Sequence, residues 1–364
     1  MRLSPIFFRY IGRQFLIWFL AVLLTVALII VLFDTMETIR RTASRPGVTF
    51  DIVLSMAFLR LPDTLQRTFP FAVLVGAMLA FWRLNRNHEL VVARAAGVSA
   101  WQFMLPVIAL AFLIGIGYVA LFNPFAAAML QRYDTLDARY NGGKSNFVNL
   151  SENGLWLRQA TERGHYIIHA PTVSENATLL HQVVVFLFEG DARFVTRIDA
   201  ATARLEDGYW RMRDVRIAAP GAQPQSVPEY GLATDLTPEN FSESFAPPQT
   251  ISFWALPEFI DILEKSGFPA LRHRVYWNTR LADPIMFCGM ILIAATMSLR
   301  LTRRGGTTPL LAAGVGVGFA TYFVSDVIFA LGASARIPVG LAAWTPALVS
   351  CLLGAAAVFH LEDG

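Results

Sequence analysis

The sequence predicts an α-helical integral membrane protein with six transmembrane helices and an extracytoplasmic all-β, jellyroll-like domain. Of the 364 residues, 55% are hydrophobic and only 16% are charged, whereas a soluble globular domain carries about 25% charged residues. The apolar residues are gathered into six runs, and one long polar segment in the middle of the chain has the short alternating pattern of strands. This composition excludes a disordered chain, a collagen and a small disulfide-stapled scaffold.

The six runs lie at residues 15–33, 69–82, 104–122, 284–299, 310–331 and 337–359, and those at 69–82 and 284–299 are shorter than the others. About 20 helical residues cross a hydrocarbon core of about 30 Å, so each run is a candidate span. The second helix must extend back through Thr64 to be long enough, and the side chain of Arg67 must then reach the interface. The first run is longer than the apolar part of a signal peptide and no small-residue cleavage site follows it, so we expect it to be retained. An even number of spans places both termini on one side of the membrane.

Arginines indicate which connections face the cytoplasm. The segments 1–14, 83–102 and 300–309 contain one acid, Glu89, and nine arginines, which are Arg2, Arg9, Arg13, Arg83, Arg86, Arg94, Arg300, Arg303 and Arg304. The positive-inside rule predicts that these segments are cytoplasmic. The segment 34–63 on the opposite side also contains arginines, and the long polar insert between the third and fourth spans lies on that side too.

This insert reads as β structure in its central part. Strand-like runs at 154–158, 166–169, 183–188, 195–205 and 209–217 follow one another without intervening helices, which is typical of a sandwich or a jelly roll. Residues 256–266 form an amphipathic pattern with Pro257 in the first turn, so we expect a short helix there. The predicted organisation is therefore three spans in 1–122, a β domain in 123–255, and the return helix with three more spans in 256–364.

Motifs for catalysis are weak throughout the chain. Gly142–Ser145 resembles the end of a phosphate-binding loop, but Ala138 stands where that motif requires glycine. His165 and His169 lack the glutamate of a zinc-protease helix and sit in strand-like sequence. We expect no enzymatic activity, no metal, no cofactor and no nucleic-acid partner.

The segment 89–99, between the second and third spans, can form a short helix that ends at Gly97. One interpretation is a connector helix lying at the membrane interface. The other is a coupling helix that seats in a groove of a separate ATPase subunit, with Glu89 pairing to a cationic side chain and Leu90 and Arg94 in the middle of the helix. The residues alone leave the two evenly balanced.

Arg40 and Arg41 follow the first span and also admit two interpretations. Glu37 and Arg41 stand four residues apart, a spacing that favours a solvated intrahelical ion pair. Alternatively, Arg40 and Arg41 face a cavity and hold the phosphates of an amphipathic lipid. Composition favours the solvated pair, because exposed pairs of this kind are common and weak.

The predicted spans contain an acidic residue, two regularly spaced glycines and two cysteines. Asp326 within the fifth span is expensive to bury, and both a structural hydrogen bond and a proton-linked role are open. Gly314 and Gly318 are spaced for close packing against another helix, more often within one chain than between two. Cys288 and Cys351 read as small buried hydrophobic residues.

Several segments together resemble the LptF/LptG permeases of the bacterial lipopolysaccharide export transporter, and the LptG branch more than the LptF branch. The resemblance rests on Arg9-Tyr-Ile-Gly12, the helix end 34–41, Glu89-Leu-Val-Val with 95–99, and the segments 154–157, 209–212, 235–238 and 263–267, in matching order. Each segment is weakly specific alone, but their order and the layout of three spans, a domain and three spans are specific together.

The resemblance implies a permease of the Gram-negative inner membrane with a periplasmic β-jellyroll. It implies an LptF-like permease partner, an LptB-like ATPase dimer, periplasmic jellyroll proteins similar to LptC and LptA, and lipopolysaccharide as cargo. By the same resemblance Glu89, Leu90, Arg94 and Gly97 belong to the contact with the ATPase. Arg40 and Arg41 match a basic pair that faces lipopolysaccharide phosphates, and Arg132 and Arg139 fall near another basic stretch.

Three alternatives stay open at the level of the sequence. The first is that the chain is the sister subunit of LptF type. The second is that it is the permease of another ABC exporter of lipids or lipoproteins, and the third is that it is a membrane scaffold that transports nothing.

Overall fold

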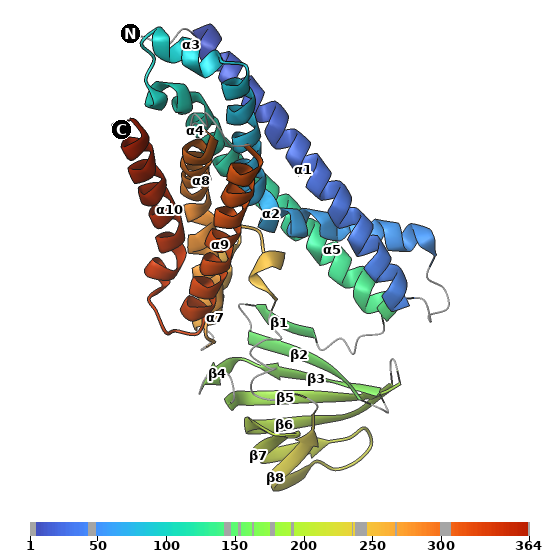
Figure 1. The fold of residues 1–364 in the computed structure, drawn as a ribbon. Helices are drawn as coiled ribbons and strands as arrows, with labels where there is room; N and C mark the ends of the chain where they lie inside the picture. Colours follow the sequence, from blue (N-terminus) through green and yellow to red (C-terminus); the bar gives the residue numbers. More distant parts are fainter. Residues whose placement is uncertain are drawn as a thin grey trace. The chain divides into compact units, whose positions relative to one another are not determined.

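The computed structural model (Figure 1) describes residues 5–42, 49–141, 147–151, 154–161, 164–174, 179–190, 193–234, 236, 246–265, 268–298 and 307–362. The arginines expected at 2, 300, 303 and 304, the loop 142–145 and most of the segment 235–238 lie outside these residues. The chain divides into two compact units, one made of residues 1–130 with 274–364 and the other of residues 131–273. Each unit is described by itself below.

The first unit is a bundle of long helices. Six helical segments are long and apolar enough to cross a membrane, so the predicted multi-pass architecture is confirmed. The elements that build them are α1 Pro5–Thr42, α2 Phe50–Arg86, α4 Ala100–Gly117 with the π-helical turn η1 Tyr118–Phe122 and α5 Asn123–Asn141, α8 Leu271–Ser298, α9 Thr307–Ala333 and α10 Val339–Glu362. The short α3, Glu89–Ala95, joins α2 to α4. The start of α1, the end of α10 and α3 lie at the same end of this bundle (Figure 1).

The membrane helices are longer than hydropathy predicts. The third span continues without a break past Phe122 to Asn141, and the fourth begins at Leu271, well before Pro284. Hydropathy misses these extensions because they contain charged and amide side chains such as Asn123 and Arg280. The side chains of Asn123 and Arg280 are largely shielded and bond to other polar groups of the bundle, so the helices continue where the sequence looks polar.

Aromatic rings and glycines hold the bundle together. Phe69 of α2 lies at the centre of a ring cluster, with ring centroids 4.9 Å from Tyr118 and 6.3 Å from Phe287. Gly314 and Gly318 of α9 pack against Met78 and Leu74 of α2, so the predicted close packing is made within the chain. Most of α1 and α9 is exposed and apolar, as expected of helices that face lipid or another apolar partner.

The second unit contains an all-β domain in the form of one antiparallel sheet. Its strands are β1 Phe147–Ser151, β2 Gly154–Thr161, β3 Gly164–Ala170, β4 Thr172–Ser174, β5 Leu179–Glu189, β6 Arg193–Glu206, β7 Tyr209–Ala218 and β8 Gln225–Ala233. The order is β1-β2-β3-β5-β6-β7-β8, with β4 paired to β5. All five predicted strand runs lie in β2, β3, β5, β6 and β7. The described strands thus follow one another as a meander rather than crossing between two sheets.

One face of the sheet forms the core of this unit. Alternate residues of β2, β3, β5, β6 and β7, including Leu157, Ile168, Val185 and Trp210, are buried together. The expected return helix is present as α7, Leu256–Lys265, and it places Leu263 in the same core. The alternation of inward apolar and outward polar residues explains why the strands could be predicted from the sequence.

Candidate functional site

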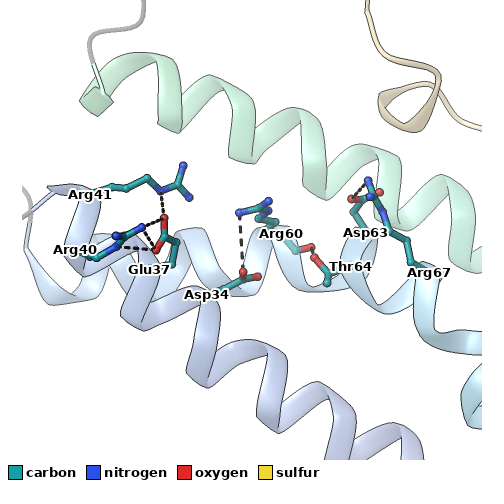
Figure 2. A network of polar contacts seen from close by, with 8 residues as sticks. All are labelled: Asp34, Glu37, Arg40, Arg41, Arg60, Asp63, Thr64 and Arg67. Carbon is teal, nitrogen blue, oxygen red and sulfur yellow. Dashed lines mark hydrogen bonds and ion pairs between the residues drawn. The ribbon is translucent and has the colours of Figure 1, made fainter. Parts of the chain in front are cut away.

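Arg40 and Arg41, the basic pair at the end of α1, are exposed. Arg40 donates from Nε to Glu37 Oε2 over 3.0 Å, and Arg41 Nε lies 3.4 Å from Glu37 Oε1. The Arg40 side chain is 79% exposed even with this ion pair in place. Figure 2 shows the Glu37 carboxylate in contact with both guanidiniums. The structure therefore contains the expected i,i+4 pair and, at the same time, leaves most of the arginine donors accessible to another anion.

The charges continue from α1 onto α2. Arg60 Nη1 lies 3.9 Å from Asp34 Oδ1 and so joins α2 to α1, and Arg67 Nη2 lies 3.6 Å from Asp63 Oδ2 (Figure 2). Asp34 and Asp63 are more buried than the arginines they pair with. Among the charged residues of α2, only Arg67 was singled out by the hydropathy pattern. The signal it missed is the spacing of 60, 63 and 67, which places the three side chains on one face of a helix.

Together these residues form a row of alternating charge, with four guanidiniums against three carboxylates. A guanidinium presents paired N–H donors that match the oxygens of a phosphate, so a row with exposed arginines can bind a phosphorylated headgroup. Arg40 and Arg41 are the most suitable members, because among the described residues they share a single carboxylate, that of Glu37.

Arg132 and Arg139 are exposed on α5. Seven residues separate them, so both point to the same side of the helix. They belong to the second compact unit, whereas Arg40 and Arg41 belong to the first. The structure thus brings Arg40 and Arg41 together around Glu37. Arg132 and Arg139 lie in the other unit, about two helical turns apart on one side of α5.

The predicted coupling helix is α3, and it ends at its glycine. Gly97 has φ +83°, a left-handed conformation that glycine adopts without strain. The backbone N–H of Gly97 donates to Arg94 O over 2.9 Å, and that of Val98 donates to Ala93 O over 3.0 Å. These two bonds form the Schellman motif, which closes the C-terminus of the helix.

One face of α3 is fixed and the other is free for a partner. Leu90 packs inward, and Glu89 Oε1 accepts hydrogen bonds from Tyr10 Oη at 3.1 Å and from Asn87 Nδ2 at 3.2 Å. Arg94 and the apolar side chains of Val91 and Val92 are exposed on the other side. An exposed, partly apolar surface on a short, well-anchored helix is suited to docking in a groove.

A buried polar network in the bundle was not predicted. Arg280 Nη1 forms an ion pair with Asp283 Oδ2 at 3.0 Å, and their side chains are only 18% and 11% exposed. The guanidinium also donates to Tyr118 Oη and lies over the rings of Tyr118 and Tyr276. The sequence analysis placed Arg280 and Asp283 before the fourth span. The available signal was their i,i+3 spacing directly ahead of an apolar run.

Asp326, by contrast, lies exposed on α9. In the part of the chain that the structure describes, no hydrogen bond or ion pair involves its carboxylate.

The comparisons with known proteins bear on the whole chain. The family described as "Lipopolysaccharide export system permease LptF/LptG" matches residues 9–359. The chain belongs to the LptF/LptG family. Among similar curated proteins, the lipopolysaccharide export system permease protein LptG of Haemophilus influenzae is 23% identical over 356 residues and covers 94% of each chain. The protein of the same description from Escherichia coli K12 is 24% identical over 369 residues, which is 97% of this chain and 96% of that one.

Membership in the LptF/LptG family explains the combination of features better than any single motif does. The match runs through both units, so the membrane bundle and the β domain belong to one permease architecture. It also confirms the resemblance inferred from the short segments, including the greater similarity to LptG.

Proposed function

We propose that this chain is the LptG-type permease subunit of an ABC transporter, which extracts lipopolysaccharide from the inner membrane and passes it to a periplasmic bridge toward the outer membrane. The observation that carries the proposal is the family match over residues 9–359, together with six membrane-spanning helices. The chain is a transporter subunit of an export system. The ATPase, the named partners and the inner membrane are the parts that we infer.

The energetics of extraction require an external energy source. Withdrawing an acyl chain from a bilayer costs about 0.8 kcal/mol per CH₂, or on the order of 10 kcal/mol for a twelve-carbon chain. Lipopolysaccharide has several such chains, so its extraction needs stepwise coupling to an external energy source. We infer that an LptB-like ATPase dimer supplies this energy and that α3 receives it. Glu89 and Arg94 are proposed to contact the ATPase, while the inward-packed Leu90 anchors the helix and Gly97 fixes where the helix stops.

The lipid headgroup is proposed to be held by arginines. Arg40 and Arg41 share one carboxylate and are otherwise accessible, which supports a contact with lipid phosphates. Arg132 and Arg139 are proposed as a second such contact. Photocrosslinking of lipopolysaccharide near α1 tests this: the combined substitution Arg40→Glu and Arg41→Glu should impair it. Arg86→Glu, an exposed arginine at the other end of α2, serves as the matched control. Unchanged crosslinking would discard the phosphate contact.

The remaining partners follow from this arrangement. We propose an LptF-like subunit as the second half of the permease. We place residues 123–255 in the periplasm, where the sheet hands the lipid to jellyroll proteins similar to LptC and LptA. Residues 1–122 and 256–364 contribute the spans on either side. ATP-driven closure of the ATPase would then move α3 and narrow the cavity between the two permeases.

One experiment tests the proposal as a whole. The intact complex is purified in mild detergent and analysed by native mass spectrometry, and the same complex is reconstituted into liposomes loaded with lipopolysaccharide. We expect a second permease, two ATPase subunits and retained lipopolysaccharide, with ATP-dependent release of the lipid to a soluble jellyroll acceptor. Release without nucleotide, or a retained lipoprotein as the only cargo, would overturn it. A complex with no ATPase and no lipid would favour the scaffold.

A further inference from the structure

The third membrane helix changes its winding at one place, and the sequence explains why. α4 gives way to the π-helical turn η1, in which the backbone N–H of Asn123 bonds to Tyr118 O, five residues back. The next residue is Pro124, which has no N–H to offer to a carbonyl four residues back and whose ring crowds that carbonyl. Single π-turns inside α-helices are rare and occur disproportionately at functional sites.

Two glycines just before the turn differ in their packing. Gly115 lies so close to α8 that a Cβ there would sit 2.5 Å from Pro284 Cα, so this part of α4 is held against α8. Gly117, two residues later, has no atom within 4 Å of the position of a Cβ. The last turn of α4 is therefore held against α8 at Gly115, whereas the position of a Cβ at Gly117 is open.

Arg280 of α8 contacts the turn directly. Its guanidinium donates to Tyr118 Oη, the first residue of η1, and lies 5.6 Å from the centroid of the Tyr118 ring. Asp283 supplies the opposite charge at 3.0 Å. A buried guanidinium that pairs with a carboxylate and a phenol is strongly attached to both, because charge-assisted contacts are stronger in the low-dielectric interior than in water.

The end of the turn is tied to two further helices. Asn123 Nδ2 donates to Gln66 Oε1 of α2 over 3.0 Å and to Tyr276 Oη of α8 over 3.1 Å. Tyr118 Oη in turn donates to Gln66 O over 3.3 Å. The beginning and the end of η1 are thus both held by polar contacts to α2 and α8.

This network is incompletely satisfied in the arrangement seen. Gln66 Nε2, Arg280 Nε and Asp283 Oδ2 are buried, and none makes a hydrogen bond to the residues that the structure describes, although Asp283 Oδ2 is within ion-pair distance of Arg280. A buried donor or acceptor without a hydrogen bond is unfavourable by about 1–3 kcal/mol. Spare donors and acceptors beside a non-standard turn allow a second arrangement of the same side chains.

We propose that η1 is a hinge in the third membrane helix and that Arg280 is the positioning residue that holds it in one of two states. The direction of α5 depends on this turn, because α5 continues from Asn123 to Asn141 as one helix. α5 also carries Arg132 and Arg139. The hinge goes beyond the proposed function, which names the cargo and the energy source but assigns no moving part to this helix.

The test measures the bend itself. Spin labels are placed at Leu105 of α4 and Ala128 of α5, two exposed positions on either side of η1, with Cys288 and Cys351 replaced by alanine. Along an unbroken α-helix these sites would be about 34 Å apart, given a rise of about 1.5 Å per residue. Pulsed electron resonance then gives the distance distribution for the full chain in lipid nanodiscs without nucleotide, and again in the vanadate-trapped transporter.

We expect one main distance without nucleotide, with any second distance populated at about 10% or less. Arg280→Gln should raise that second population to about half of the molecules, roughly a fivefold increase. Tyr118→Phe removes only the hydroxyl that Arg280 and Gln66 share, and it should shift the same population in the same direction if Arg280→Gln does not fold. Trapping should move the unaltered chain toward the second distance, and Pro124→Ala should abolish that movement.

Pro106→Ala is the matched control, because Pro106 also lies within the third helix but the chain stays α-helical after it as far as Gly117. Its distances should equal those of the unaltered chain. Identical distributions in the unaltered chain, Arg280→Gln and Tyr118→Phe would overturn the hinge. If no ATPase co-purifies, the proposed function fails, but the nucleotide-free comparison still decides the hinge.

Discussion

Asn123 and Tyr276 stand 153 positions apart in the chain, and the amide of Asn123 donates to the hydroxyl of Tyr276 over 3.1 Å. The entire β domain lies between them in the sequence. The two residues belong to the helices by which the chain leaves and re-enters the membrane bundle. Their hydrogen bond, with the ion pair of Arg280 and Asp283, fastens the third and fourth membrane helices together from inside the bundle.

Removing only one partner of the ion pair between Arg280 and Asp283 should destabilise the protein. Arg280→Gln leaves a buried carboxylate without its partner, and such changes destabilise proteins by about 3–5 kcal/mol. Adding Asp283→Asn removes the leftover charge, so the double variant should melt at a higher temperature than Arg280→Gln alone. Thermal unfolding of the purified chain, followed by tryptophan fluorescence, measures this. A double variant less stable than both single variants would contradict a simple ion pair.

Two glycines of α4 should respond in opposite ways to alanine. Gly115→Ala forces a Cβ against the backbone of Pro284, and overpacking of this kind destabilises by about 1–3 kcal/mol. Gly117→Ala meets no neighbour and gains helix propensity, so its stability should be unchanged or raised by up to about 1 kcal/mol. Melting temperatures of the two variants side by side provide the measurement. Equal losses at both sites would show that α4 and α8 are not in close contact.

Glu37 should compete with lipid phosphates for Arg40 and Arg41. Glu37→Gln removes a carboxylate that both arginines now contact, so the affinity for lipopolysaccharide should rise. Exposed ion pairs of this kind contribute less than about 1 kcal/mol, so the melting temperature should hardly move. Titration of lipopolysaccharide against the complex in detergent gives the affinity. Weaker binding in Glu37→Gln would mean that the carboxylate orients the arginines rather than competing with the phosphate.

Glu89→Lys should release the ATPase from the complex. It reverses the charge at the start of α3 and also removes the acceptor of the Tyr10 hydroxyl. Tyr10→Phe removes only that hydrogen bond, and it should retain the ATPase through affinity purification. If Tyr10→Phe loses the ATPase as completely as Glu89→Lys does, the role of Glu89 is to hold α3 in place rather than to contact a partner.

The β domain should depend on Trp210 and tolerate the loss of Trp156. Trp210 is fully buried in the core of the sheet, and truncating a buried tryptophan destabilises by about 3–5 kcal/mol. Trp156 is 41% exposed on the opposite face. Limited proteolysis of the full chain should cleave the domain of Trp210→Ala much faster than that of Trp156→Ala. Equal rates would contradict the assignment of the two faces.

The fold was largely predictable because its dominant signals are local. Twenty apolar residues in a row predict a span wherever they occur, and the alternation along β6 and β7 predicts strands without knowledge of their partners. The end of α3 at Gly97 was equally readable, because the left-handed residue that closes a helix is usually glycine. The exposed pair of Glu37 with Arg41 followed from helical spacing alone.

The polar core of the bundle was not predictable in this way. Arg280, Asp283 and Asn123 lower the hydropathy of their segments, so a sequence window assigns them to the surface. The free-energy cost of burying them is offset only in the folded bundle, where Tyr118, Tyr276 and Gln66 form hydrogen bonds with them.

The sequence by itself determined that this protein crosses a membrane six times, carries one β domain between the third and fourth spans, and exposes arginines at the end of its first helix. Only the tertiary structure decided how far each span extends and which residues of α2 join the row of alternating charge. It also decided that the third helix contains the π-turn η1, which is held by contacts to α2 and α8. The reason is physical. Hydrophobic and strand periodicities depend on residues that are close together in the sequence. The free-energy cost of burying a charge depends instead on groups that are distant in the chain and contact the charge only after folding.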